Sequence, residues 1–310
     1  MMRKIRYQKL NAFTAGESLG NPAAVLYLPE RQTLSEREML AIAREHRGFV
    51  SEVVYCARKN GTIHLTFYSS EGEVDFCGHG TIGCMYSLFE GTPEMMDRRR
   101  TTIETNRRGP LTVYNELQTH NAVMVASPKP VYMGTGIEAE VIADNLGVAQ
   151  NVLLSKYPVD LIDAGLKTLI VPIRRLTKEI TITPGENRLK AFCETEGIDI
   201  VLIYSLEVAD KNCIAHTRVF SPRFGYLEDP ATGSGNSAFG YYMMKNRLWD
   251  GANCLIEQGG GDSLYNQVRL TTVNGEVLFG GAVTLRVDGV YCLEDKEPEE
   301  AAPPPLVAAR

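Results

Sequence analysis

The sequence predicts an α+β protein made of two similar halves, and three observations support that prediction. A segment near residue 70 repeats at a spacing of 153 residues, which carries Phe67 to Phe220. Short runs of β-branched residues are typical of strands, and three capping-box patterns are typical of helix starts. The chain has 310 residues, of which 44% are hydrophobic, so it can build about two domains with a sizeable core.

Strands are expected first near residue 25 and again between residues 50 and 70. In these stretches apolar residues follow one another or alternate with polar ones, as they do on the faces of a sheet. The residues that carry this pattern are Val25, Val53, Val54, Ile63, Leu65 and Phe67.

Three helices are expected to begin with the same device. Thr33 to Glu36, Thr135 to Glu138 and Thr183 to Glu186 each match the capping box, in which the threonine oxygen accepts an unpaired amide and the glutamate reaches back to the cap. Apolar residues at helical spacing follow each box. Gly147 and Gly197 stand where the second and third of these helices should end.

The internal repeat aligns Phe67–Thr81 with Phe220–Ser234 without a gap. Each segment follows a strand-like run and opens a predicted helix, Thr81–Phe89 in the first half and Ser234–Met244 in the second. A pseudo-twofold relation between the halves would place the two glycine-containing turns face to face.

Two such turns would make a binding site for an anion. Glycine lets the backbone approach a ligand closely, and the first amides of a helix have no partner within the helix. The helix dipole adds about half a positive charge there, so two converging helix starts favour a carboxylate. The polar side chains available in the turns are Asp75, Cys77, His79, Glu228, Asp229, Thr232, Ser234 and Asn236.

Composition argues against several classes of protein. The net charge of -6 makes a nucleic-acid partner unexpected, and no run approaches the roughly 20 apolar residues of a membrane helix. The N-terminus lacks the apolar core of a secretion signal. The seven cysteines form no CxxC pair and the five histidines show no metal-ligand spacing. We therefore expect a cytoplasmic protein with reduced thiols and no metal.

Four motifs in order along the chain resemble the PhzF family, the phenazine-biosynthesis-type isomerases. They are GNPAAV (20–25), SEVV (51–54), EVDFCGHGTIG (73–83) and EDPATGSGNSAFGYYM (228–243), and the resemblance spans about residues 5 to 290. It implies the diaminopimelate-epimerase-like fold, in which two pseudo-symmetric halves each wrap a mixed sheet around a central helix. It also implies an active site between the halves, a homodimer, and neither cofactor nor metal.

With that fold, we expect an N-terminal half over residues 1–120 and a C-terminal half over residues 121–281. A strand from about residues 282–293 is expected to join the N-terminal half. The segment 294–310 is acidic and then rich in proline and alanine, which predicts disorder.

The resemblance also implies roles for individual residues. Glu52 would move a proton between carbon atoms of a small carboxylate-bearing substrate, with His79 and Asp229 holding its amine or hydroxyl. Departures from the family pattern near Gly80 and Gly235 predict a substrate other than the phenazine precursor. The residues expected to bind the substrate are Asn21, Ser51, Gly78, Gly80, Thr81, Gly233, Ser234 and Gly235.

Three alternatives stay open at this stage. The first is a cysteine-assisted epimerase or dehydratase, because Cys77 stands where racemases of the superfamily carry a catalytic cysteine. The residue that matches Cys77 in the gap-free repeat is Pro230, which disfavours a racemase with two catalytic thiols. A binding protein of the same fold without catalysis is another. The third is dinucleotide binding by the GxGxxA pattern at Gly233–Ala238, which the polar, proline-containing residues before it argue against.

Overall fold

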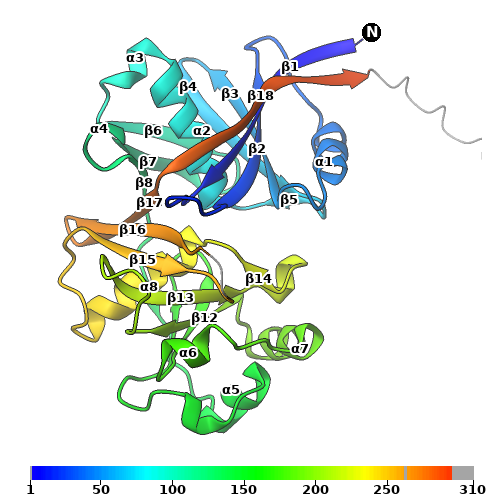
Figure 1. The fold of residues 1–310 in the computed structure, drawn as a ribbon. Helices are drawn as coiled ribbons and strands as arrows, with labels where there is room; N and C mark the ends of the chain where they lie inside the picture. The colour runs from blue at the N-terminus through cyan, green and yellow to red at the C-terminus, as the bar shows by residue number, and fades with distance from the viewer. Residues whose placement is uncertain (1, 262–263, 295–310) are drawn as a thin grey trace, which may run out of the picture.

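The computed structural model describes residues 2–261 and 264–294, and it consists of two halves joined through one continuous sheet (Figure 1). Each half curls its part of the sheet around one helix, α2 (Gly78–Gly91) in the N-terminal half and α8 (Gly233–Lys245) in the C-terminal half. The predicted α+β class is therefore confirmed. Both central helices are almost wholly buried, as a helix enclosed by a sheet must be.

The N-terminal half has the strand order β18-β1-β2-β3-β4-β6-β7-β8, with the short β5 on β4 and the helix α1 outside the sheet. The strands that were expected around residues 25 and 50–70 are β2, β3 and β4, which confirms that prediction. The elements are β1 (Met2–Ala12), β2 (Asn21–Leu28), α1 (Glu36–Glu45), β3 (Glu52–Lys59), β4 (Thr62–Ser69), β5 (Glu73–Val74), α3 (Pro93–Met96), β6 (Arg100–Thr105), β7 (Gly109–Glu116), α4 (Leu117–His120), β8 (Ala122–Ala126) and β18 (Val283–Glu294).

The C-terminal half has the order β9-β10-β11-β12-β13-β15-β16-β17, with β14 on β13. Its elements are β9 (Val131–Tyr132), α5 (Ala139–Leu146), η1 (Gln150–Val152), β10 (Asp160–Asp163), β11 (Lys167–Pro172), α6 (Leu176–Glu179), α7 (Glu186–Glu196), β12 (Ile200–Ser205), β13 (Cys213–Phe220), η2 (Pro222–Phe224), β14 (Glu228–Asp229), β15 (Cys254–Gln258), β16 (Asn266–Val273) and β17 (Glu276–Gly281).

The pairing pattern makes the two halves pseudo-symmetric. The parallel pairs β2–β3 and β4–β6 correspond to β11–β12 and β13–β15. The antiparallel pair β8–β17 joins the halves. The strand that follows β8 in the chain, β9, pairs with β10 of the C-terminal half. The strand that follows β17, β18, pairs with β1 of the N-terminal half. Figure 1 shows β18, in orange to red, running beside β1 in the upper half.

The predicted capping boxes are wrong in position, although helices follow all three. The first helix, α1, has Ser35 as its N-cap in a complete capping box with Glu38, so the box lies two residues beyond the predicted one. Serine and glutamate at that spacing fit the same pattern as Thr33 and Glu36. The N-caps of α5 and α7 are Glu138 and Gly185, and neither makes a side-chain cap bond.

The helix ends are correctly predicted. Gly147 and Gly197 are the C-cap residues of α5 and α7, and both adopt the left-handed conformation that glycine allows.

The gap-free repeat needs a correction at the central helices, because α2 begins three residues earlier than expected, at Gly78, and α8 only one residue earlier, at Gly233. The N-caps Cys77 and Thr232 have nearly the same backbone angles, so they are the matching positions. Ten residues separate Phe67 from Cys77, but twelve separate Phe220 from Thr232. The loop around Gly225 holds the extra length. Cys77 therefore matches Thr232 and not Pro230.

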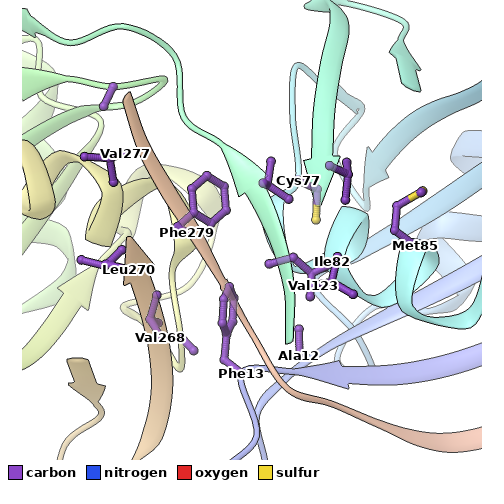
Figure 2. Packing of buried hydrophobic residues seen from close by; sticks show 14 of the residues in the cluster. Ala12, Phe13, Cys77, Ile82, Met85, Val123, Val268, Leu270, Val277 and Phe279 are labelled. Carbon is purple, nitrogen blue, oxygen red and sulfur yellow. The ribbon is translucent and has the colours of Figure 1, made fainter. Parts of the chain in front are cut away.

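The two helix starts meet at one aromatic side chain, Phe279 of β17. A Cβ at Gly233 would lie 2.3 Å from its ring and a Cβ at Gly78 would lie 3.1 Å away. Figure 2 shows Phe279 and Phe13 between residues of the C-terminal half, such as Val277, and residues of the N-terminal half, such as Cys77. The glycine-containing turns thus face each other across this core.

The predicted tail lies almost wholly outside the described residues, since Glu294 ends β18 and residues 295–310 are not described. Among the described residues, no helix combines the length and the apolar character needed to cross a membrane.

Candidate active site

A cavity of about 480 Å³ lies between the two halves and is lined by both helix starts. Glu52, Cys77 and His79 reach it from the N-terminal half, and Asp229 and Ser234 reach it from the C-terminal half. Cys77 and His79 from one predicted turn and Asp229 and Ser234 from the other therefore line the same cavity.

Glu52 is the first residue of β3 and is 8% exposed. Its strand is held on both sides, because Glu52 lies beside Ala23 of β2 and Ser69 of β4. Its Oε2 lies 3.1 Å from Nε2 of His79, the second residue of α2. A carboxylate on a paired strand, held by an imidazole at a helix start, has little freedom to move.

Cys77 belongs to the same group of side chains. Its Sγ lies 3.8 Å from Glu52 Oε2 and 3.6 Å from both ring nitrogens of His79. The sulfur also accepts the amide of Gly80 at 3.3 Å, so it caps α2. Cys77 is buried, and its thiol contacts both Glu52 and His79.

Burial and neighbouring charges shift the pKa values of Cys77 and His79. Burial raises the pKa of the Cys77 thiol. Burial lowers the pKa of the His79 imidazole, but the adjoining Cys77 sulfur and Glu52 carboxylate outweigh that effect and hold it well above its ordinary value. A protonated His79 donates to the Glu52 carboxylate in a charge-assisted hydrogen bond.

Asp229 faces the same cavity from β14 and is 6% exposed. Asn21 Nδ2 donates to its Oδ1 at 2.7 Å, and the Thr232 hydroxyl donates to its Oδ2 at 2.5 Å. Burial raises the pKa of Asp229 to about 6, although His79 and these hydrogen bonds act in the opposite direction. The Gln258 side chain donates to the backbone oxygen of Asp229 at 2.9 Å and fixes the turn.

The start of α8 leaves its amides available to a ligand. Thr232 is the N-cap, but its hydroxyl donates to Asp229 and makes no bond to the helix. Gly233 and Ser234, the first two residues of α8, line the cavity. Unpaired amides at the positive end of a 13-residue helix favour an anion.

The remaining residues that were expected to bind substrate divide into two groups. Gly78 lines the cavity together with Gly233 and Ser234. The other five lie behind its wall or beside it, and several support the wall: Asn21 holds Asp229, the Thr81 hydroxyl donates to the Cys77 carbonyl, and Gly80 lies against Val54 and Cys77. The five residues outside the lining are Asn21, Ser51, Gly80, Thr81 and Gly235.

The cavity has further polar walls that sequence reasoning missed. Arg108 lines it and donates to the backbone oxygen of Gly165, so it bridges the halves at 2.6 Å. Arg223 lines it and pairs with Asp199 at 2.8 Å, and Tyr226 stands near Asp229. Arg223 lies within the repeated segment and Arg108 lies outside it, and no sequence spacing connects either residue to Glu52.

Comparison with known proteins identifies the family. The model for phenazine biosynthesis-like proteins, PhzC-PhzF, matches residues 10–285. The chain belongs to the PhzF family. The resemblance inferred from the four motifs is therefore confirmed.

Two curated relatives are similar over most of their length. An uncharacterized isomerase of Bacillus subtilis is 26% identical over 264 residues, covering 83% of this chain and 87% of the relative. The trans-2,3-dihydro-3-hydroxyanthranilate isomerase of Pseudomonas fluorescens is 25% identical over 250 residues, covering 77% of this chain and 80% of the relative.

Solved structures agree on the fold. The PhzF-family protein of Bacillus anthracis superposes with a TM-score of 0.79 at 24% identity, covering 93% of this chain and 99% of that one. A hydroxyproline epimerase of Agrobacterium vitis superposes with a TM-score of 0.60 at 13% identity, covering 96% and 93%. The chain therefore has the fold of these two proteins, and not the doubly wound sheet of a dinucleotide-binding protein.

Proposed function

We propose that this PhzF-family isomerase moves a proton between two carbon atoms of a small carboxylate-bearing substrate, with Glu52 as the general acid and base. The observation that carries the proposal is the position of the Glu52 carboxylate on the cavity wall, 3.1 Å from His79 Nε2 and in the same cavity as Asp229. A positioned carboxylate can both accept a proton and return it.

The proposed reaction conserves electrons and needs no oxidant. Glu52 takes a proton from carbon, and the electron pair of that C–H bond forms a new double bond. The electrons of the neighbouring double bond then take a proton at its far carbon, delivered by the same carboxyl group. The substrate leaves with the same atoms and a shifted double bond, which is an isomerisation.

The rest of the cavity would bind and orient the substrate. His79 and Asp229 would hold an amine or hydroxyl, since one can donate and the other can accept. The hydroxyl of Ser234 and the amides at Gly78 and Gly233 would hold the carboxylate and stabilise charge that spreads into it during transfer. We place this activity in the cytoplasm, in a homodimer, on a carboxylate other than the phenazine precursor.

Exchange with solvent deuterium tests the proposal on a panel of candidate substrates. Small unsaturated amino and hydroxy acids, which carry the double bond that the step needs, are incubated with the protein in D₂O, and deuterium at carbon is measured by mass spectrometry and NMR. For the acid that exchanges, Glu52→Gln should lower the rate by about 10²–10⁴ because it removes the base and keeps the shape. Glu94→Gln, an exposed change in α3, is the matched control.

Cys77 is the second candidate for the base, because its sulfur lies 3.6 Å from His79 and 3.8 Å from Glu52. A thiol route would abolish exchange in Cys77→Ser and leave it in Glu52→Gln, which would overturn the role of Glu52. If the protein binds carboxylates but exchanges no proton in any of them, it is a binding protein of the same fold without catalysis, and the proposed function is wrong.

A further inference from the structure

Three side chains of the cavity wall bring three different donor atoms together. Glu52 Oε2, Cys77 Sγ and His79 Nε2 lie within 4.8 Å of one another. The separations are 3.1 Å between oxygen and nitrogen, 3.6 Å between sulfur and nitrogen, and 3.8 Å between sulfur and oxygen. No sequence spacing predicts this set of donor atoms, because Glu52 lies on β3 and the other two residues lie at the start of α2.

These separations fit one face of a tetrahedral zinc site. Bonds of about 2.3 Å to sulfur and about 2.0–2.1 Å to nitrogen and oxygen give edges of about 3.6 Å from sulfur to each partner and about 3.4 Å between nitrogen and oxygen. Each observed separation lies within about 0.3 Å of that value. The three donor atoms can therefore enclose an ion through small side-chain rotations, without movement of β3 or α2.

We propose that Glu52, Cys77 and His79 form a binding site for a single Zn²⁺ ion, whose fourth position opens onto the cavity. A thiolate, an imidazole and a carboxylate together favour zinc over magnesium or calcium, which prefer oxygen ligands alone. The thiol gives its proton to solvent as the ion binds. The thiolate and the carboxylate then balance the two charges of the ion.

Burial raises the pKa of the Cys77 thiol, but two features beside the sulfur act in the opposite direction and would stabilise the thiolate that binds the ion. The Gly80 amide already points at the sulfur at 3.3 Å, and the positive end of α2 stabilises a thiolate. Asp229, buried in the same cavity, adds a further negative group nearby. The ion needs no separate path, since all three donor side chains line the cavity.

Zinc at this site would compete with proton transfer. The ion would take the Glu52 oxygen and the His79 nitrogen that otherwise contact each other at 3.1 Å. Zinc should therefore inhibit the isomerase, and this consequence rests on the proposed function, whereas the binding of zinc does not. The two are distinguished by measuring binding directly.

Cobalt substitution provides the direct measurement. Chelator-treated full-length protein is titrated with Co²⁺, and a thiolate-bound tetrahedral ion should give a near-ultraviolet charge-transfer band and strong visible bands that saturate at one ion per chain. Added Zn²⁺ should remove both. Cys77→Ser should lose the charge-transfer band, and Cys292→Ser, which changes an exposed thiol far along the chain, should keep it.

Two further variants guard against a misfolded Cys77→Ser protein. Glu52→Gln and His79→Gln should each keep the charge-transfer band and weaken cobalt binding by at least about tenfold. Circular dichroism checks the fold of each. The proposal is overturned if wild-type protein shows no thiolate band, if the band persists in Cys77→Ser, or if neither of the other two variants weakens binding.

Discussion

The buried carboxyl of Asp229 makes the stability of this protein depend on pH. Its pKa rises from an ordinary value of 3.8 to about 6 in the folded chain. Between these values the folded state holds a proton that the unfolded state releases, so the free energy of unfolding should fall as pH rises from about 4 to 6. A shift of about two units corresponds to about 3 kcal/mol.

Asp229→Asn should remove this part of the pH dependence. The amide keeps an oxygen for Asn21, which donates to Oδ1 at 2.7 Å, and cannot ionise. Urea unfolding of both proteins at pH 4, 5 and 6 gives the two slopes. Relative to the wild type, the variant should gain stability as pH rises, and parallel curves would contradict the buried-carboxyl assignment.

The candidate site shows where sequence reasoning succeeds for single residues and where it stops. Motifs lead to Glu52, His79 and Asp229, and all three line one cavity. The contact of Cys77 with Glu52 depends on how β3 packs beside α2, which no spacing encodes. Arg108 reaches the cavity by crossing to Gly165 of the other half, a contact set by the whole fold.

At the scale of elements, the two central helices are positioned by their shared contact with Phe279. An alanine at Gly233 would place its Cβ 2.3 Å from the ring, whereas the same change at Gly91, the last residue of α2, meets no atom within 4 Å. Phe279 is fully enclosed in the core and cannot move aside freely. The glycine is therefore required by packing.

Gly233→Ala should destabilise the protein by about 1–3 kcal/mol, because overpacking exceeds the gain of about 1 kcal/mol that alanine brings to a helix. Gly91→Ala is the matched control and should be neutral or stabilising. Phe279→Leu should recover part of the loss in the double variant, which thermal unfolding measures. Additive losses in the double variant would place the steric conflict elsewhere.

The elements also show the limits of pattern matching. Thr33 to Glu36 and Ser35 to Glu38 satisfy the same capping rule, and only the folded chain shows that Ser35 is the cap. The repeat rests on similar residues, but the longer loop at Gly225 shifts the true match by two positions. The type of each of these predicted helices follows from the sequence, whereas their first residues depend on tertiary contacts.

At the scale of the whole molecule, the chain ties its two halves together three times. β8 pairs with β17 across the junction, and β9 and β18 each complete the edge of the opposite half. β18 pairs with β1 from Met2 to Ala12, so the N-terminal half needs a strand from the far end of the chain. Neither half can complete its own sheet.

The two halves should therefore unfold in one transition. Hydrogen exchange read by mass spectrometry at increasing urea reports each half separately, through peptides from β3 and β4 and from β12 and β13. Exchange of these buried strands should rise with the same midpoint, together with the fluorescence of Trp249, the single tryptophan. Removing β18 by ending the chain at residue 282 should lower the midpoint for β12 and β13 as well as for β3 and β4, although β18 pairs with neither C-terminal strand. Separate midpoints would mean that the exchanged strands do not couple the halves.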